Sequence, residues 1–232
     1  METKPVCIIP ARGGSKRVLG KNVAEFNGKP LIAWSIRTAI RSNVFSSVIV
    51  STDDERIASV AKENGAEIPF MRNAKLADDH TGTAEVLVDA LSRLQPVDYA
   101  CCLYPTAPLV TEADLQQAFQ LLVESDADSV VAVTEFDFPP MRAFARQPNN
   151  RLTFQWPEYA KTRSQDLPEL IHDAGAFYFF KTVALQQYQT LITENSVGYS
   201  MPRSRAVDID TPDDLALAKT LHSMQLSKER QG

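Results

Sequence analysis

The sequence lacks any apolar stretch that approaches the roughly 20 residues a helix needs to cross a bilayer. It also lacks a signal-peptide pattern, because Met1 to Pro5 lead directly into a short apolar run. Its three cysteines and three histidines, in 232 residues, have the spacing of neither a disulfide framework nor a zinc site. We therefore expect a cytoplasmic protein without membrane spans, whose cysteines are reduced core residues.

No charge of one sign dominates the chain. Lys and Arg number 24 against 29 Asp and Glu, and the resulting net charge of −5 argues against general binding of nucleic acid. Hydrophobic residues make up 44% and charged residues 23%, which is ordinary for a globular protein. We predict a single domain over residues 1–232 that carries one small insertion.

Short apolar runs alternate with helical patterns through the first half of the chain. Residues 6–9, 47–50, 67–70, 99–103 and 129–133 are predicted strands, and later strands are expected at 174–180 and 197–201. Helices are expected between them, and a last helix from Pro212 to about residue 225. The alternation predicts an α/β fold with a mostly parallel, Rossmann-like sheet and helices on both faces. Ligands of such sheets bind beyond the carboxyl ends of the strands.

The alternation is interrupted after residue 133. Residues 136–141 contain two adjacent prolines, Pro148-Asn149-Asn150 is typical of a turn, and the residues around Leu152 alternate as in a short ribbon. We predict that residues 137–172 leave the main sheet as a lid or a dimer arm.

The first predicted strand ends at Pro10 in a basic, glycine-rich loop. Residues 12–22 contain three glycines, two arginines and two lysines, and no acidic residue occurs from Lys4 to Ala24. Glycines let backbone N–H groups approach a ligand closely, and fixed positive charges suit a polyphosphate. The loop has neither the G-x-x-x-x-G-K-[ST] nor the G-x-G-x-x-G pattern. It is therefore either a phosphate loop of another type or a solvated basic loop.

Asp208 and Asp210 form the second strong pattern. In an extended segment, residues i and i+2 lie on the same face, and two adjacent carboxylates repel unless a cation lies between them. The pattern predicts Mg²⁺ shared with a polyphosphate. The alternative is that Asp210 or Thr211 caps the next helix, and we assign the capping to Thr211 and Asp214 instead.

Four further segments contain candidate ligand-binding side chains, each with a plainer explanation. The stiff segment 104–108, Tyr-Pro-Thr-Ala-Pro, either joins a strand to a helix or forms the wall of a nucleobase pocket. Thr81 or Thr83 either caps a helix or faces a ligand. Arg163 is either a surface group or binds a carboxylate, and His172 either pairs structurally with the next residue, an aspartate, or belongs to a site.

Taken together, these segments resemble the cytidylyltransferases that activate nonulosonic (sialic-type) acids. The matching residues, in the same order as in that family, are 9–17, 21–22, 50–53, 103–108 and 208–211. Residues 78–83, 163–167 and 172–175 look most like the branch that uses pseudaminic acid. The chain departs from that branch at Ala176, where glutamine is usual, and at Leu19, where proline is common.

The resemblance implies that CMP is transferred from CTP to the anomeric 2-hydroxyl of a nine-carbon acid, with Mg²⁺ as cofactor and a homodimer as the assembly. It also implies roles for individual residues. Those implied to be catalytic are Lys16, Lys21, Asp208 and Asp210, the last two holding the metal. Those implied to bind the nucleotide are Arg12, Gly13, Gly14, Ser15, Lys16, Asn22, Thr81, Pro105 and Thr106, and those implied to bind the sugar are Tyr104, Arg163, Gln165 and His172.

Other functions are compatible with parts of this pattern. The acceptor is alternatively N-acetylneuraminic or legionaminic acid. A dinucleotide-dependent oxidoreductase is disfavoured, because Asp53 follows Gly13 by about 40 residues where about 20 is usual. A non-catalytic nucleotide-binding module would need no paired Asp208 and Asp210.

Overall fold

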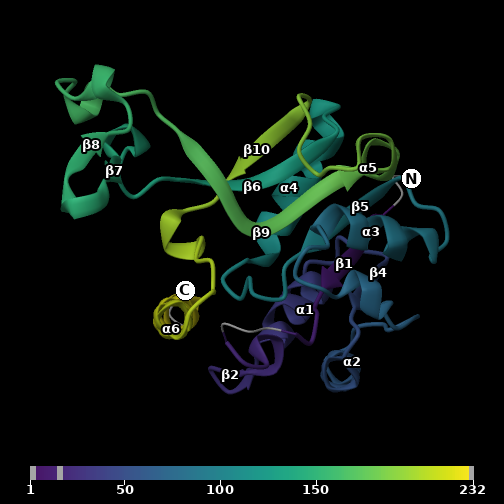
Figure 1. Ribbon diagram of the computed structural model, residues 1–232. Helices are drawn as coiled ribbons and strands as arrows, with labels where there is room; N and C mark the ends of the chain where they lie inside the picture. The colour runs from purple at the N-terminus through teal and green to yellow at the C-terminus, as the bar shows by residue number, and fades with distance from the viewer. Residues whose placement is uncertain (1–3, 15–17, 230–232) are drawn as a thin grey trace.

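Figure 1 shows a computed structural model of the chain, which describes residues 4–14 and 18–229. A six-stranded sheet with the order β10-β6-β9-β5-β1-β4 forms its centre. All neighbours pair in parallel except β9, which is antiparallel to both β5 and β6. The predicted mostly parallel α/β sheet is therefore confirmed. The strands are β1 (Val6–Pro10), β4 (Ser47–Ser51), β5 (Tyr99–Leu103), β6 (Ser129–Glu135), β9 (Ile171–Lys181) and β10 (Ser196–Ser200).

Helices cover both faces of the sheet, as the alternation predicted. Because side chains alternate along a strand, Cys7 and Ile9 of β1 belong to one core cluster and Ile8 belongs to the other. The first cluster includes side chains of α1 and α4, and the second includes side chains of α3 and α5. Among the described residues, no helix is both long and apolar enough to cross a membrane. The helices are α1 (Leu31–Arg41), α2 (Glu55–Glu63), α3 (Thr83–Ser92), α4 (Glu112–Ser125), α5 (Thr182–Tyr188) and α6 (Pro212–Glu229).

One of the predicted strands is absent. Residues 67–70 do not form a strand, since Glu67 makes only an isolated bridge to Ile49. The helix α6 leaves the apolar side chains of Leu217 and Met224 more than half exposed. Its contact with the body is made instead through Ala218 and His222, both of which are buried.

The C-terminal helix α6 packs against the hairpin that follows the basic loop. This hairpin consists of β2 (Glu25–Phe26) and β3 (Lys29–Pro30). Asn27, at the hairpin turn, donates to the carbonyl of Lys219 at 2.9 Å, and the His222 ring packs edge-on against Phe26 and Trp34. These contacts fasten the C-terminal helix to the segment between β1 and α1.

Residues 136–170 leave the main sheet between β6 and β9. They contain a small antiparallel ribbon of β7 (Phe144–Arg146) and β8 (Leu152–Phe154), which the alternation around Leu152 predicted. Figure 1 shows this segment, which we call the arm, projecting from the body beyond β6 and β9. Phe138, Phe144 and Leu152 are all more than half exposed on it.

The three cysteines are free thiols buried in β1 and β5, which confirms the prediction of small core residues. Burial raises the pKa of the Cys101 and Cys102 thiols well above its usual value. These thiols therefore stay protonated and behave as apolar core groups.

Candidate active site

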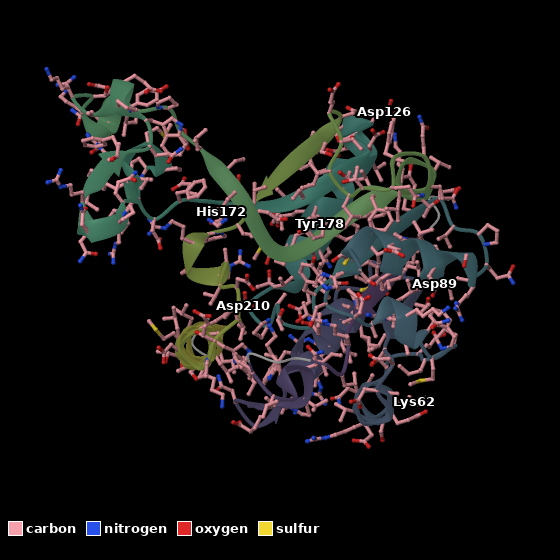
Figure 2. All side chains as sticks on the ribbon, in the orientation of Figure 1. Lys62, Asp89, Asp126, His172, Tyr178 and Asp210 are labelled. Carbon is pink, nitrogen blue, oxygen red and sulfur yellow. The ribbon has the colours of Figure 1, made fainter. Side chains whose placement is uncertain are left out.

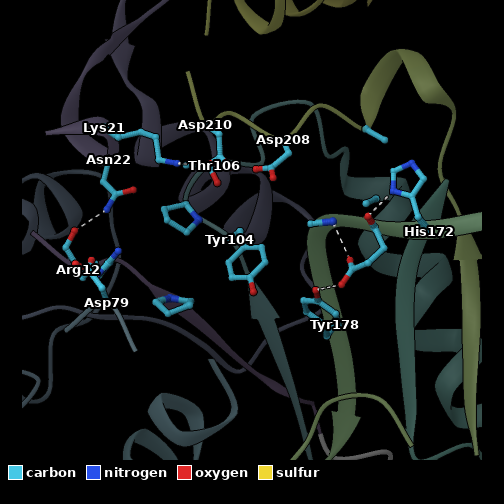
Figure 3. Close-up of a pocket in the computed structure, with 16 residues that line it drawn as sticks. Arg12, Lys21, Asn22, Asp79, Tyr104, Thr106, His172, Tyr178, Asp208 and Asp210 are labelled. Carbon is cyan, nitrogen blue, oxygen red and sulfur yellow. Dashed lines mark hydrogen bonds and ion pairs between the residues drawn. The ribbon is translucent and has the colours of Figure 1, made fainter. Parts of the chain in front are cut away.

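A cavity of about 830 Å³ opens where β1 and β5 end at their carboxyl sides (Figure 3). This is the edge at which an α/β sheet is expected to bind its ligand. Five segments far apart in the sequence contribute to its walls. They are the loop after β1 (Arg12, Lys21 and Asn22), the segment before α3 (Asp79), the loop after β5 (residues 104–106), the first half of β9 (residues 172–175) and the segment before α6 (Ala206, Asp208 and Asp210).

Asp208 and Asp210 point into this cavity together because Ile209 points away from it. Ile209 is fully buried against Phe26 and other apolar side chains of a small core cluster. The predicted alternation is thus present, although residues 206–210 are not part of a regular strand. The Nζ of Lys21 lies 3.3 Å from Asp210 Oδ1 and donates to the Ile209 carbonyl at 2.5 Å. The basic loop and the paired carboxylates therefore meet in one place.

The cap of α6 is formed by Thr211 and Asp214 rather than by the side chains of Asp208 and Asp210. The backbone N–H and the hydroxyl of Thr211 both donate to Asp214 Oδ2, at 2.7 and 2.8 Å, and Thr211 Oγ1 accepts from the N–H of Asp214. This confirms that Thr211 and Asp214 form the helix cap.

The two carboxylates fit a magnesium ion that is shared with a substrate. Within residues 4–14 and 18–229, no group of three or more Asp, Glu, His or Cys side chains could hold a metal ion without further ligands. Mg²⁺ is commonly bound by one or two carboxylates together with substrate phosphates and water. Asp208 and Asp210, beside the basic loop, provide this donor set.

The loop after β1 is held by bonds to neighbouring segments. Arg12 Nη1 donates to the Asp78 carbonyl and to Asp79 Oδ1, both at 2.7 Å. The buried side chain of Asn22 donates from Nδ2 to the Arg12 carbonyl at 3.0 Å. Asn22 therefore holds the loop in place as well as lining the cavity.

Position 13 requires a glycine because the backbone there lies against the side chain of Asp54. Its N–H donates to Asp53 Oδ1 at 3.0 Å, and a Cβ at this position would lie 2.7 Å from Asp54 Oδ2. The Gly13 N–H is thus engaged within the protein. Gly14 has open space around it, whereas the candidates Ser15 and Lys16 lie outside the described residues.

A smaller cavity of about 220 Å³ adjoins the first and contains Arg72, a residue that the sequence analysis missed. Arg72 is buried, and its Nε donates to Ser51 Oγ at 3.1 Å while its Nη2 donates to the Ser51 carbonyl. Burial lowers the pKa of this guanidinium, and the nearby Asp53 opposes that effect. The only signal in the sequence was the position of Arg72 two residues after the segment 67–70 that was predicted to be a strand.

Thr81 and Thr83 line this smaller cavity, and neither caps α3, whose first flanking residue is Gly82. Thr81 donates from its hydroxyl to Asp78 Oδ1 at 2.8 Å, and this bond and others lower the pKa of the Asp78 carboxyl. The Thr83 hydroxyl lies 3.0 Å from the Tyr104 hydroxyl. Both threonines therefore belong to the wall of the cavity, and the helix-capping alternative is wrong for both.

On the β9 side, His172 and Asp173 do not pair through their side chains. The Nδ1–H of His172 donates to the backbone carbonyl of Asp173 at 2.8 Å, and the imidazole packs against the Phe136 ring. The Asp173 carboxylate accepts from the Gly175 N–H at 2.8 Å and from the Tyr178 hydroxyl. His172 and Asp173 both line the larger cavity, together with Tyr104, Pro105 and Thr106.

Arg163 and Gln165, two of the candidate sugar-binding residues, lie on the arm and do not line the cavity. The Nε of Arg163 forms an ion pair with Asp166 Oδ2 at 2.6 Å, and 72% of the arginine side chain is exposed. A single chain thus brings Tyr104 and His172 together but leaves Arg163 and Gln165 elsewhere. Ala176 is also absent from the cavity wall, because its side chain is buried in the core.

The sequence matches the family described as Cytidylyltransferase over residues 6–228. It is 42% identical over 225 residues to a pseudaminic acid cytidylyltransferase from Campylobacter jejuni, covering 95% of this chain and 97% of that protein. It is 31% identical to a CMP-N,N'-diacetyllegionaminic acid synthase from Legionella pneumophila, covering 97% of each. A solved CMP:2-keto-3-deoxy-manno-octonic acid synthetase, complexed with CTP, shares the fold with a TM-score of 0.73 at 20% identity, over 96% of this chain and 100% of that one. The chain is therefore a nucleotidyltransferase of the cytidylyltransferase family, in the branch of the nonulosonic acid cytidylyltransferases.

Proposed function

We propose that this protein transfers CMP from CTP to the anomeric 2-hydroxyl of pseudaminic acid and releases pyrophosphate. The observation that carries the proposal is the meeting of Lys21 with Asp210 in one cavity, which places the basic loop beside a carboxylate pair. The 42% identity to the pseudaminic acid enzyme of Campylobacter jejuni supports this choice of acceptor.

The two cavities suggest how the substrates are divided between them. The cytosine fits the smaller cavity, where the cationic Arg72 and the hydroxyls of Thr81 and Thr83 offer hydrogen bonds to its polar edge. The triphosphate then extends past Arg12 toward Lys21, whose positive charges favour it. The acceptor occupies the remainder of the larger cavity, between Tyr104 and His172.

In this arrangement the acceptor oxygen attacks the α-phosphorus in line as the bond to pyrophosphate breaks. Asp208 and Asp210 would hold Mg²⁺, which neutralises developing charge and orients the reacting oxygens. Lys21 stabilises negative charge on the phosphates. Its hydrogen bond to the Ile209 carbonyl holds the ammonium group in position beside Asp210. The predicted roles of Ser15 and Lys16 in the same loop are part of this proposal.

We also propose a homodimer in which the arm of each protomer reaches the other protomer's cavity. The exposed apolar side chains Phe138, Phe144 and Leu152 are typical of a surface that is covered in an assembly. A partner's arm would supply Arg163 and Gln165, which do not reach the cavity of their own chain. The net charge of −5 favours small-molecule substrates over nucleic acid, and the free buried thiols suit the cytoplasm.

Pyrophosphate release from CTP and Mg²⁺ with three acceptors in parallel tests the function. The acceptors are pseudaminic, legionaminic and N-acetylneuraminic acid. We expect release with pseudaminic acid at the highest kcat/KM. Pyrophosphate release mainly with another acid would support the proposed reaction but show that the acceptor is that acid. Release with none of the three acids would refute the proposed function. Light scattering of the same sample measures whether the active species is a dimer.

A further inference from the structure

Strand β9 departs from regular pairing beside the cavity. Tyr178 pairs with Val131 and Asp173 pairs with Val133, so the four β9 residues 174–177 lie opposite the single β6 residue Ala132. Gly175, within this bulge, has φ of +60°, a left-handed conformation that glycine adopts without strain. Bulges bend a strand and redirect its side chains, and they occur often next to active sites.

The bulge presents the Asp173 carboxylate to the cavity in a fixed orientation. The Gly175 N–H donates to Oδ1 at 2.8 Å and the Tyr178 hydroxyl donates to Oδ2. Burial, and then the neighbouring Tyr104, raise the pKa of the Tyr178 hydroxyl, so it remains a protonated donor. The carboxylate is exposed and lines the cavity, and an ionised carboxylate can accept about four hydrogen bonds.

No cation neutralises this carboxylate in the part of the chain that the structure describes. The ion pairs formed there by Arg12 and Lys21 are to Asp79 and Asp210, and none involves Asp173. A fixed carboxylate that has no cationic partner among residues 4–14 and 18–229, and that faces a polar cavity, is suited to accept hydrogen bonds from a neutral donor.

The position of Asp173 in the cavity indicates which part of the acceptor it meets. In Figure 3, Tyr178 and His172 lie at one end, Arg12 lies at the other, and Asp208 and Asp210 lie between them. A 2-keto acid has its own carboxylate next to the reacting carbon. That group is attracted to Lys21 and the metal position but repelled by Asp173, so the acceptor's far end faces Asp173.

We propose that Asp173 is a specificity-determining residue of the acceptor site, which accepts hydrogen bonds from N–H or O–H groups of the sugar remote from its reacting carbon. Tyr178 and the Gly175 bulge are positioning elements that hold its carboxylate. This inference rests on the proposed function, because the acceptor class is taken from it.

The substitution Asp173→Asn tests the proposal because it separates recognition from structure. Asparagine keeps an oxygen for the Gly175 N–H and the same size, but it removes the negative charge and half of the acceptor capacity. We expect the KM for pseudaminic acid to rise about 10- to 100-fold, the range expected for a hydrogen bond to a charged group, while the KM for CTP changes less than about twofold. The preference for pseudaminic over N-acetylneuraminic acid should fall at the same time.

Two further variants keep the test decisive. Tyr178→Phe leaves the carboxylate but removes its donor, and we expect a smaller rise in the acceptor KM, of about 3- to 10-fold. Asp126→Asn is the matched control. It removes one negative charge where Asp126 pairs with Lys181 at the far end of β9, well away from His172 in Figure 2, and should change neither KM.

The dissociation constant of each acid, measured by calorimetry with α,β-methylene CTP present, completes the experiment. If wild type binds and converts an acid but Asp173→Asn and Tyr178→Phe lower only the Tm, Asp173 is merely structural and the inference is wrong. If wild type neither binds nor converts any of the three acids, the proposed function fails and the inference falls with it.

Discussion

Replacing Arg205 by methionine should destabilise the protein and disturb the segment that carries the paired carboxylates. Arg205 makes two hydrogen bonds to Asp114 on α4, one of them 2.9 Å from Nη2 to Oδ1. The Asp114 side chain is only 3% exposed and the Arg205 side chain 22%. Arg205 is the last residue of the 3-10 turn that precedes Ala206. The ion pair therefore holds in place the backbone that leads to Asp208.

The expected size of the effect follows from what remains after the change. Removing one partner of a buried ion pair typically costs about 3–5 kcal/mol. Asp114 would keep its bonds from Thr111 N–H at 2.8 Å, the Thr111 hydroxyl at 2.7 Å and the Tyr199 hydroxyl at 3.0 Å. We therefore expect the lower end, about 3 kcal/mol of unfolding free energy, which for a chain of this size lowers the Tm by about 6–12 °C.

Urea unfolding followed by circular dichroism at pH 7 measures this change, with Arg205→Lys as the milder control. Asp114→Asn combined with Arg205→Met should recover part of the loss, because the double variant leaves no buried charge unpaired. A loss below about 0.5 kcal/mol for Arg205→Met would refute the reasoning.

The same pair predicts how stability depends on pH. Burial alone would raise the pKa of Asp114, but hydrogen bonds from Arg205 and Thr111 outweigh it and leave the pKa below its usual value. A lowered carboxyl pKa contributes stability that is fully present above the unfolded value of about 4 and is lost as the pH falls through the folded value. The Arg205→Met variant should therefore lose less stability than wild type on acidification below about pH 4, as acid titration of the same unfolding curves would show.

Two further predictions concern turnover and substrate binding. Lys16→Ala or Asp210→Ala should lower kcat by roughly 10²–10³ in a protein that still folds, because each removes a group that we propose stabilises charge in the transition state. Pyrophosphate release measures this, and near-wild-type activity of folded Asp210→Ala would contradict the proposed metal site. Arg72→Met should raise the KM for CTP about tenfold or more, with little change in the KM for the acceptor, because the Arg72 guanidinium lines the smaller cavity. If the variant and the wild type have the same KM for CTP, the cytosine does not bind in that cavity.

Much of the sheet could be predicted because its strands are buried on both faces and therefore form continuous apolar runs. Residues 99–103 coincide with β5, and the edges of β1 and β4 differ from prediction by one residue. Residues 67–70 are Glu-Ile-Pro-Phe and pair only at Glu67, because the proline has no N–H to donate to a neighbouring strand.

The candidate site was predictable where spacing alone determines geometry. Asp208 and Asp210 share a face because alternation is local, and Thr211 with Asp214 forms a local cap. Arg72 could not be found in this way, because its partner Ser51 precedes it by 21 residues and a lone arginine has no pattern. Asp173 was noticed only as a neighbour of His172, since nothing local indicates that its carboxylate would be held by Tyr178 across a bulge.

The antiparallel position of β9 has a consequence for the order in which the protein can assemble. β9 lies between β5 and β6, yet it is made after both, so the half-sheet of β5, β1 and β4 cannot join the strand β6 until β9 has been synthesised. The bond from Lys21 to the Ile209 carbonyl then spans 188 residues. On a ribosome, the chain therefore completes the proposed site only after Ile209 and Asp210 have emerged, and the sequence-distant contacts that complete it are those expected to form slowly.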